Sequence, residues 1–142
     1  MSDKENPSFG KYGKRFQENL VQAILDDRPF ADQIFEVLDT RFLELKYLRT
    51  FVNLVREYRE KYGTHPSRDT MLTILRAEID DEDELIKKQV REYFTRVCSS
   101  TDKIDGLEHT KEVSLDFCKK QKLKEAMAVS YTHLTLPTKR IV

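Results

Sequence analysis

Residues 48–67 read LRTFVNLVREYREKYGTHPS, and this stretch contains both a helix and the signals that end it. Its large apolar and aromatic side chains recur at alternating steps of three and four residues, which is the spacing of one helix face. That face consists of Leu48, Phe51, Val55, Tyr58 and Tyr62. Gly63 stands where a left-handed C-terminal cap belongs, and Pro66 prevents the helix from continuing. The stretch therefore predicts a helix that packs along another helix.

The same spacing predicts helices over most of the remaining chain. The expected helices are about Lys14 to Asp26, a short one with Pro29 in its first turn, the longest one from Arg41 to Tyr62 after a cap at Asp39-Thr40, one capped by Ser67 that carries Met71, Leu72, Leu75 and Ile79, one over residues 85–97, and a final one from Leu107 to about Ala128. The last two are joined by a polar turn over residues 99–106, so we expect them to form an antiparallel hairpin.

Composition supports an all-α class. The chain has four Gly and four Pro in 142 residues, which is too little punctuation for many short strands. We expect a single compact helical domain of about six helices, ending in the helical hairpin, over residues 14–128. Residues 1–13 are polar and read as a flexible lead-in, from which Phe9 and Tyr12 are candidates for packing back onto the body.

Charge, cysteine content and hydropathy indicate the cellular compartment in which the protein is expected. The whole chain is balanced, and the residues before 129 carry 23 basic against 25 acidic side chains. Cys98 and Cys118 lie far apart without a partner motif, so each is expected to be a small core residue in a reducing compartment. The chain has no apolar run of bilayer length and no signal-peptide pattern at its start. A cytoplasmic protein without membrane contact is the expectation.

Residues 80–84 read DDEDE and have two interpretations. The functional one is a metal site or a mimic of nucleic acid. The structural one is the start of the next helix, where the macrodipole favours carboxylates. Because the run leads directly into helically spaced apolar residues, the structural interpretation is favoured.

No arrangement typical of catalysis is found in the sequence. Gly10-Lys11 and Gly13-Lys14 lack the following Ser or Thr of a phosphate-binding loop. His65, His109 and His133 lack neighbouring ligands at zinc spacing. We therefore expect a non-enzymatic chain with no cofactor and no metal.

Four stretches resemble the N-terminal domain of DnaB-type replicative DNA helicases, particularly phage versions. They are Phe16 to Val21 with the Pro29-Phe30 helix after it, Ile34 to Phe42 with its LDTRFL step, the helix end YREKYGTHPS (58–67), and LDFCKKQKLKEA (115–126). In this family a Tyr-Gly-x-x-Pro-Ser/Thr turn leads into the next helix, and Tyr62 to Ser67 match it. The resemblance covers residues 14–128, and its motifs are helix boundaries, not catalytic signatures.

The resemblance implies a non-catalytic scaffold that acts in DNA replication. Such domains form a collar above a hexameric motor ring, pair with neighbouring subunits and contact primase or a helicase loader. The family's ATP and Mg sites lie in a motor domain whose motifs are missing here, so the chain is expected to be a truncated fragment. The alternative function is a free-standing helical phage regulator or helicase-loading factor that acts by protein contact.

The candidate protein-interaction residues lie on the predicted hairpin. They are Ile86, Val90, Tyr93, Phe94 and Phe117. One hypothesis is that the hairpin buries this stripe against the same hairpin of another protomer. The favoured alternative is that all five residues fill the core of the monomer.

Residues 129–138 read VSYTHLTLPT and are similar to the translation, in one reading frame, of a transposon-derived sequencing adaptor. Agreement over the whole stretch makes coincidence a poor explanation. We therefore expect residues 129–142 to be a non-native tail, and the natural protein to continue differently after about Ala128.

A DNA-binding domain is a third hypothesis, and it has a direct test. Because the residues before 129 have no positive excess, we expect no measurable affinity for duplex DNA at moderate salt. Fluorescence anisotropy of labelled duplex, titrated with the chain at several salt concentrations, measures this. A binding curve with a steep salt dependence would support the DNA-binding hypothesis instead.

Overall fold

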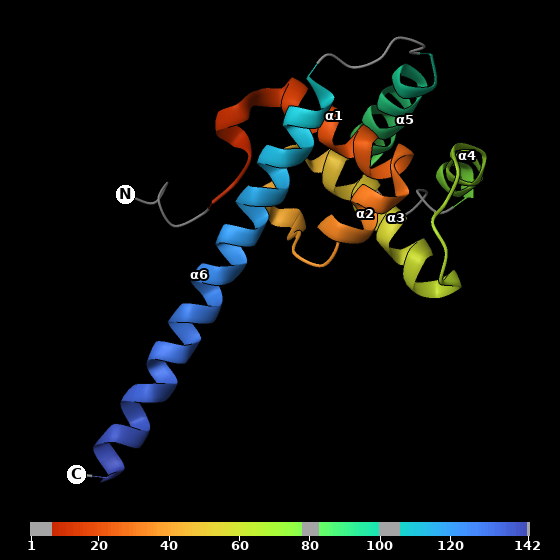
Figure 1. Cartoon of the computed structure of the whole chain (residues 1–142). Helices are drawn as coiled ribbons and strands as arrows, with labels where there is room; N and C mark the ends of the chain where they lie inside the picture. Colours follow the sequence, from red (N-terminus) through yellow and green to blue (C-terminus); the bar gives the residue numbers. More distant parts are fainter. Residues whose placement is uncertain (1–6, 78–82, 100–105, 142) are drawn as a thin grey trace.

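A computed structural model describes residues 7–77, 83–99 and 106–141, and for residues 129–141 only the course of the backbone (Figure 1). All regular structure in these ranges is helical, which confirms the predicted all-α class. The elements are the 3-10 helix η2 (Gly10–Tyr12), α1 (Gly13–Asp26), α2 (Arg28–Ile34), the 3-10 helix η3 (Thr40–Phe42), α3 (Lys46–Tyr62), α4 (Arg68–Ala77), α5 (Glu84–Ser99) and α6 (Leu107–Ile141).

Helix α1 packs against three other helices, α2, α3 and α6, while α5 packs on α3. The inward face of α1 is broad enough to contact all three helices, because apolar residues stand at consecutive as well as helically spaced positions. Leu20, Val21, Ala23, Ile24 and Leu25 are all buried. Asp27 ends α1 and begins α2, since its carboxylate accepts a hydrogen bond from the Phe30 amide at 3.1 Å. Pro29 lies in the first turn of α2, as predicted.

The end of α3 follows the signals in its sequence. Gly63 has φ 69° and ψ 17°, the left-handed cap conformation, and its amide donates to the Arg59 carbonyl. The Ser67 hydroxyl then caps α4 by accepting a hydrogen bond from the Thr70 amide at 3.1 Å. Both predicted boundaries are confirmed.

His65, within this turn, links α3 to the end of α1. Its Nδ1 lies 2.8 Å from an Arg59 guanidinium nitrogen, and its Nε2 lies 2.7 Å from the Leu25 carbonyl oxygen. Because arginine can only donate, Nδ1 accepts and the Nε2 proton is donated to the carbonyl. Both ring nitrogens are therefore used to hold the turn against α1.

The start of α3 differs from the prediction, because the helix begins at Lys46 and not at Arg41. Asp39 does act as a cap, but of the short helix η3, by accepting a hydrogen bond from the Arg41 amide at 2.9 Å. The next backbone groups are used elsewhere. The Phe42 carbonyl accepts from the Phe9 amide at 2.8 Å, and the Glu44 amide donates to the Gln17 side chain at 2.9 Å. These long-range bonds hold residues 43–45 outside a helix.

The described part of the N-terminal lead, residues 7–13, belongs to the packed body. Phe9 is 0% exposed, so the expectation that it packs back is confirmed, whereas Tyr12 is 36% exposed. The Phe9 ring lies 4.8 Å from that of Phe117 and 6.0 Å from that of Phe42, and the last two rings meet edge-on at 5.2 Å. This aromatic cluster joins the N-terminal segment, η3 and α6.

The predicted hairpin of the last two helices is wrong. Helix α5 packs on α3, where the Tyr93 and Phe51 rings meet edge-on at 5.5 Å, and α6 packs on α1 and α2. Helix α1 also contacts α5, because the Tyr93 hydroxyl donates to the Glu18 carbonyl at 2.6 Å. Consecutive helices therefore pack on different partners, and Figure 1 shows α5 and α6 well apart.

Helix α6 runs from Leu107 to Ile141 and is longer than α3, so the prediction that the helix ending at Tyr62 is the longest was wrong. The predicted end near Ala128 is also not where this helix stops. Residues 107–136 contain neither Gly nor Pro, so no strong helix breaker lies near Ala128. The helical course over residues 129–141 does not bear on whether that tail is native.

The described end of the acidic run agrees with a helix start. The Asp83 carboxylate accepts a hydrogen bond from the Leu85 amide at 3.0 Å, and α5 begins at Glu84. The other members of the run, residues 80–82, lie outside the described residues, as do Ile79 and most of the turn predicted over residues 99–106.

Replacing Phe9 tests whether the lead belongs to the core. We expect Phe9→Ala to lower the free energy of unfolding by about 3–5 kcal/mol, because a fully buried ring is removed. The matched control is Tyr12→Ala three residues later, which removes a partly exposed ring and is expected to cost about 1 kcal/mol. Urea denaturation followed by circular dichroism measures both. Equal losses for the two variants would contradict this assignment.

Candidate interaction surface

Four of the five predicted interaction residues come together, and all four are buried. Ile86, Val90, Tyr93 and Phe94 lie on the face of α5 that packs into the domain, with at most 7% of each side chain exposed. Phe117 lies apart from them, half-buried in the aromatic cluster with Phe9 and Phe42. The first four side chains therefore lie in the core of the monomer, and Phe117 packs against that core while remaining partly exposed.

A polar junction around Glu18 holds α5 in place. The Glu18 carboxylate accepts from the Tyr47 hydroxyl and pairs with Arg96 at 2.6 Å. Burial and the neighbouring Glu18 charge raise the pKa of the Tyr93 hydroxyl well above its usual value. Burial likewise raises the pKa of Tyr47, with the hydrogen bond to Glu18 second. Both phenols therefore stay protonated and serve as hydrogen-bond donors, a structural role.

The two cysteines differ from each other, and one differs from its prediction. Cys118 is buried as expected, and burial raises the pKa of its thiol to about 12. Cys98 is exposed, so its assignment to the core was wrong. Val97 occupies the inward position at that end of α5, and the next residue along a helix turns about 100° away from it.

No group of three or more His, Cys, Asp or Glu side chains in the described residues is arranged to hold a metal ion. His65 is used in the α3–α4 turn, and His109 is exposed on the first turn of α6. Over the same residues, no helix has the length and apolar character of a membrane span.

The first half of α6 is fixed to the body by packing and by one shared lysine. Thr110, Ser114 and Cys118 form its buried stripe. The Lys111 ammonium lies 2.5 Å from the Asp27 carboxylate and 3.0 Å from that of Glu108. The hydrogen bond from Lys111 holds the pKa of Asp27 below its usual range, against the opposing effect of burial. Asp27 therefore joins three helices at one point, since it also caps α2.

The C-terminal part of α6 projects away from the body (Figure 1), and Cys118 is the last buried residue of this helix before Ala128. From Lys119 to Ala128 every side chain except that of Gln121 is exposed. Leu123 is 59% exposed and Met127 is 61% exposed. They are the two most exposed large apolar side chains of α6 between Leu107 and Ala128. We call Lys119, Lys120, Leu123, Lys124 and Met127 the outer face of α6. The sequence predicted this helix but not this surface, although the lysines among its residues were a signal for it.

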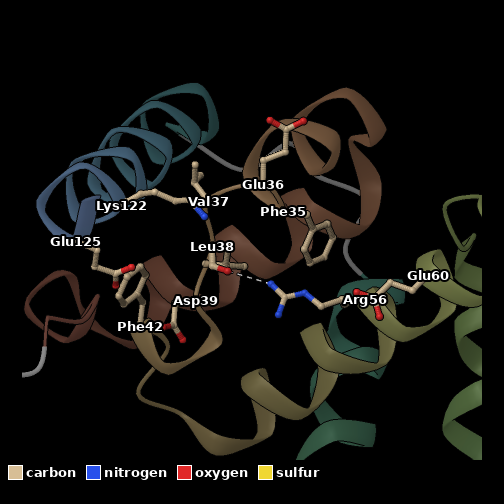
Figure 2. Close-up of a pocket in the computed structure, with 10 residues that line it drawn as sticks. All are labelled: Phe35, Glu36, Val37, Leu38, Asp39, Phe42, Arg56, Glu60, Lys122 and Glu125. Atoms are coloured by element: carbon tan, nitrogen blue, oxygen red, sulfur yellow. Dashed lines mark hydrogen bonds between the residues drawn. The ribbon is translucent and has the colours of Figure 1, made fainter. Parts of the chain in front are cut away.

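A hollow of about 410 Å³ lies beside this projection, between the α2–η3 turn, α3 and α6 (Figure 2). We call it the α3–α6 hollow. It is lined by Phe35, Glu36, Val37, Leu38, Asp39, Phe42, Arg56, Glu60, Lys122 and Glu125. Four of these side chains are carboxylates and two are cations, so the lining is acidic. Its members come from three separate segments, which is why periodicity along the chain gave no sign of it.

Some charged groups of the hollow make hydrogen bonds or ion pairs, and others make no ion pair within the described residues. Arg56 donates to the Leu38 carbonyl at 3.0 Å and its guanidinium lies over the Phe35 ring at 5.3 Å. Asp39 pairs with Arg41 at 2.7 Å, and the hydrogen bond from Arg41 lowers the pKa of the Asp39 carboxyl. Within the described residues, Glu36 and Glu60 make no ion pair. The hollow therefore presents carboxylates of Glu36 and Glu60 and the ammonium group of Lys122 around a Phe35 ring over which Arg56 and Arg59 already lie.

No protein-family model, curated protein or solved structure matches this chain. The similarity to helicase N-terminal domains therefore stays a prediction.

The Lys111–Asp27 pair predicts a particular pH dependence. Because the folded state lowers the pKa of Asp27, the pair stabilises the protein above the ordinary Asp pKa of about 3.9, and this stabilisation is lost as pH falls through the lowered value. We expect Lys111→Met to cost about 1 kcal/mol at pH 7, and its difference from the unchanged chain to shrink below about pH 4.

Urea denaturation at pH 7, 5, 4 and 3 measures this difference. Asp27→Asn is the matched control, because an amide oxygen still caps α2 but carries no charge. In the Asp27→Asn background the Lys111→Met cost should be smaller and less dependent on pH. A cost that stays constant from pH 7 to pH 3 would contradict the assignment.

Proposed function

We propose that this chain is a non-catalytic scaffold and interaction domain of a DnaB-type replicative DNA helicase, acting in the cytoplasm during DNA replication. Its role is subunit pairing and contact with primase or a helicase loader, with ATP and Mg bound by a motor domain elsewhere in the parent protein. The observation that carries the proposal is the exposure of the apolar side chains of Leu123 and Met127 on α6, the helix whose C-terminal part projects from the body (Figure 1).

Three features support a role exercised through contact. Four of the five predicted interaction residues are buried within the monomer and Phe117 is half-buried, whereas Leu123 and Met127 on the outer face of α6 are among the exposed large apolar side chains. Polar side chains with perturbed pKa, such as Tyr93 and Asp27, hold helices together. Exposed apolar residues that share one side of a helix and are bordered by charges are typical of protein-binding surfaces.

A second function, a free-standing helical phage regulator or helicase-loading factor, uses the same surface. It is favoured by the same outer face of α6, because a helix that projects from a small body can insert into a groove of a larger partner. The two functions differ in what the gene encodes after the codon for Ala128.

The experiment is to sequence the gene from its source DNA across that codon. We expect the frame to continue without the VSYTHLTLPT sequence and to reach a strand followed by a Gly-x-x-x-x-Gly-Lys-Ser/Thr loop, the phosphate-binding element of a motor domain. A stop codon soon after Ala128 would exclude the helicase proposal and favour the regulator. Hydrolysis of ATP by the purified 142-residue chain would contradict both.

A further inference from the structure

A small pocket lies between α2 and the turn that follows α3. Its volume is about 130 Å³, well above the ~15 Å³ that one water molecule needs, so it can hold a group of several heavy atoms. We call it the turn pocket, and it is lined by Arg28, Asp32, Arg59, Gly63, Thr64 and His65. Because His65 accepts a hydrogen bond through Nδ1 and is neutral, two arginines and one aspartate give the lining a net positive charge.

Arg59 is held in a fixed position in the lining of the turn pocket. One guanidinium nitrogen lies 2.8 Å from Nδ1 of His65, and the other terminal nitrogen donates to the Asp32 carboxylate at 2.6 Å. The guanidinium also lies over the Phe35 ring at 5.1 Å. A guanidinium has five N–H donors, so these two hydrogen bonds leave donors available. Arg59 is therefore a preorganised donor group with unused capacity.

Two further lining residues offer donors that have no partner within the described residues. The exposed Arg28 side chain makes no hydrogen bond and no ion pair in that part of the chain. Over the same residues, Thr64 makes no hydrogen bond through its amide or its hydroxyl group. Helix α2, helix α3 and the turn therefore each bring donor capacity to one pocket.

The turn pocket already stabilises one negative charge, that of Asp32. The hydrogen bond from Arg59 lowers the pKa of the Asp32 carboxyl against the opposing effect of burial, and the charges of Arg59 and Arg28 lower this pKa further. The Asp32 side chain is 56% exposed, whereas the Arg59 side chain is 21% exposed. Because an exposed ion pair contributes little to stability, Asp32 can turn out to solvent when another anion takes its place beside Arg59.

We propose that the turn pocket binds phosphate, either as the free ion or as the end group of a small phosphate monoester. The phosphate oxygens accept hydrogen bonds from Arg28, Arg59 and the Thr64 hydroxyl. Asp32 turns out to solvent in the bound state. A phosphate group carries a charge of about −1.5 to −2 at neutral pH, so it suits two guanidinium groups better than a singly charged carboxylate does.

This site goes beyond the proposed function and does not depend on it, because no residue of the outer face of α6 takes part. Arginine is also the side chain best suited to it, since its planar fork of donors matches the oxygens of a phosphate group.

Amide NMR spectra of the full 142-residue chain, titrated with inorganic phosphate at pH 7, test the proposal. We expect saturable shifts of the signals of Gly63, Thr64 and His65, while acetate at equal ionic strength leaves them nearly unchanged. A second titration, with glycerol phosphate, distinguishes the two sources of the ligand. A lower dissociation constant than that of inorganic phosphate identifies a monoester as the ligand, and a higher one identifies the free ion.

Two substitutions should change the affinity for phosphate in opposite directions. Arg28→Gln removes one guanidinium and should raise the dissociation constant by about tenfold, because a charge-assisted hydrogen bond is lost. Asp32→Asn removes the competing carboxylate and should lower the dissociation constant by about threefold. Arg41→Gln is the matched control, because Arg41 is also an exposed arginine paired with an aspartate but does not line the turn pocket. It should leave the affinity unchanged.

Circular dichroism checks that the three variants remain folded, as expected for replacements of exposed side chains. Amide signals that do not respond to phosphate would overturn the inference, as would an Arg28→Gln variant that binds phosphate as tightly as the unchanged chain. Acetate that binds as tightly as phosphate would contradict the choice of ligand, and weaker binding by Asp32→Asn would contradict the displacement of Asp32. None of these outcomes bears on the gene sequence after Ala128, which tests the proposed function separately.

Discussion

The fold depends on the aromatic cluster of Phe9, Phe42 and Phe117, because it joins three segments that are far apart in the sequence. Aromatic rings bury a large area and favour edge-on and tilted contacts, so three of them fix both distance and orientation. The backbone hydrogen bond between Phe9 and Phe42 adds a fixed spacing. The point at which α6 leaves the body, one residue after Phe117, follows from this cluster. Both the projecting helix and the wall of the neighbouring hollow depend on it.

Local signals in the sequence correctly predicted those helix ends that depend on residues close together in the chain. Gly63 ends α3, Pro29 lies in the first turn of α2, and Ser67 caps α4, because each of these effects involves residues a few positions apart. The start of α3 could not be found in this way, since it is set by bonds from Phe42 and Glu44 to segments about thirty residues away. The prediction that the last two helices form a hairpin was wrong for the same reason, because long-range contacts decide which helices pack together. Periodicity identifies an apolar face but does not say which helix will cover it.

The candidate surface was less predictable than the fold. The sequence correctly marked residues of α5 as apolar and inward-facing, and it left open whether they pair within or between chains. Their burial against α3 and α1 could be known only once those helices were placed. The lysines of α6 were visible in the sequence, but a lysine-rich helix end is common and carries no information about what faces it. The hollow combines three segments, so no single stretch of residues encodes it.

The segment of α6 after Cys118 also fixes the distance and the orientation of whatever follows it in the chain. Each helical residue adds about 1.5 Å and about 100° of rotation, so the ten residues after Cys118 carry whatever follows them about 15 Å outward in a defined angular phase. A rod of this kind transmits orientation as well as distance. One inserted residue in the free segment would swing everything downstream through more than a quarter turn, while a seven-residue insertion would nearly restore the phase and only lengthen the arm.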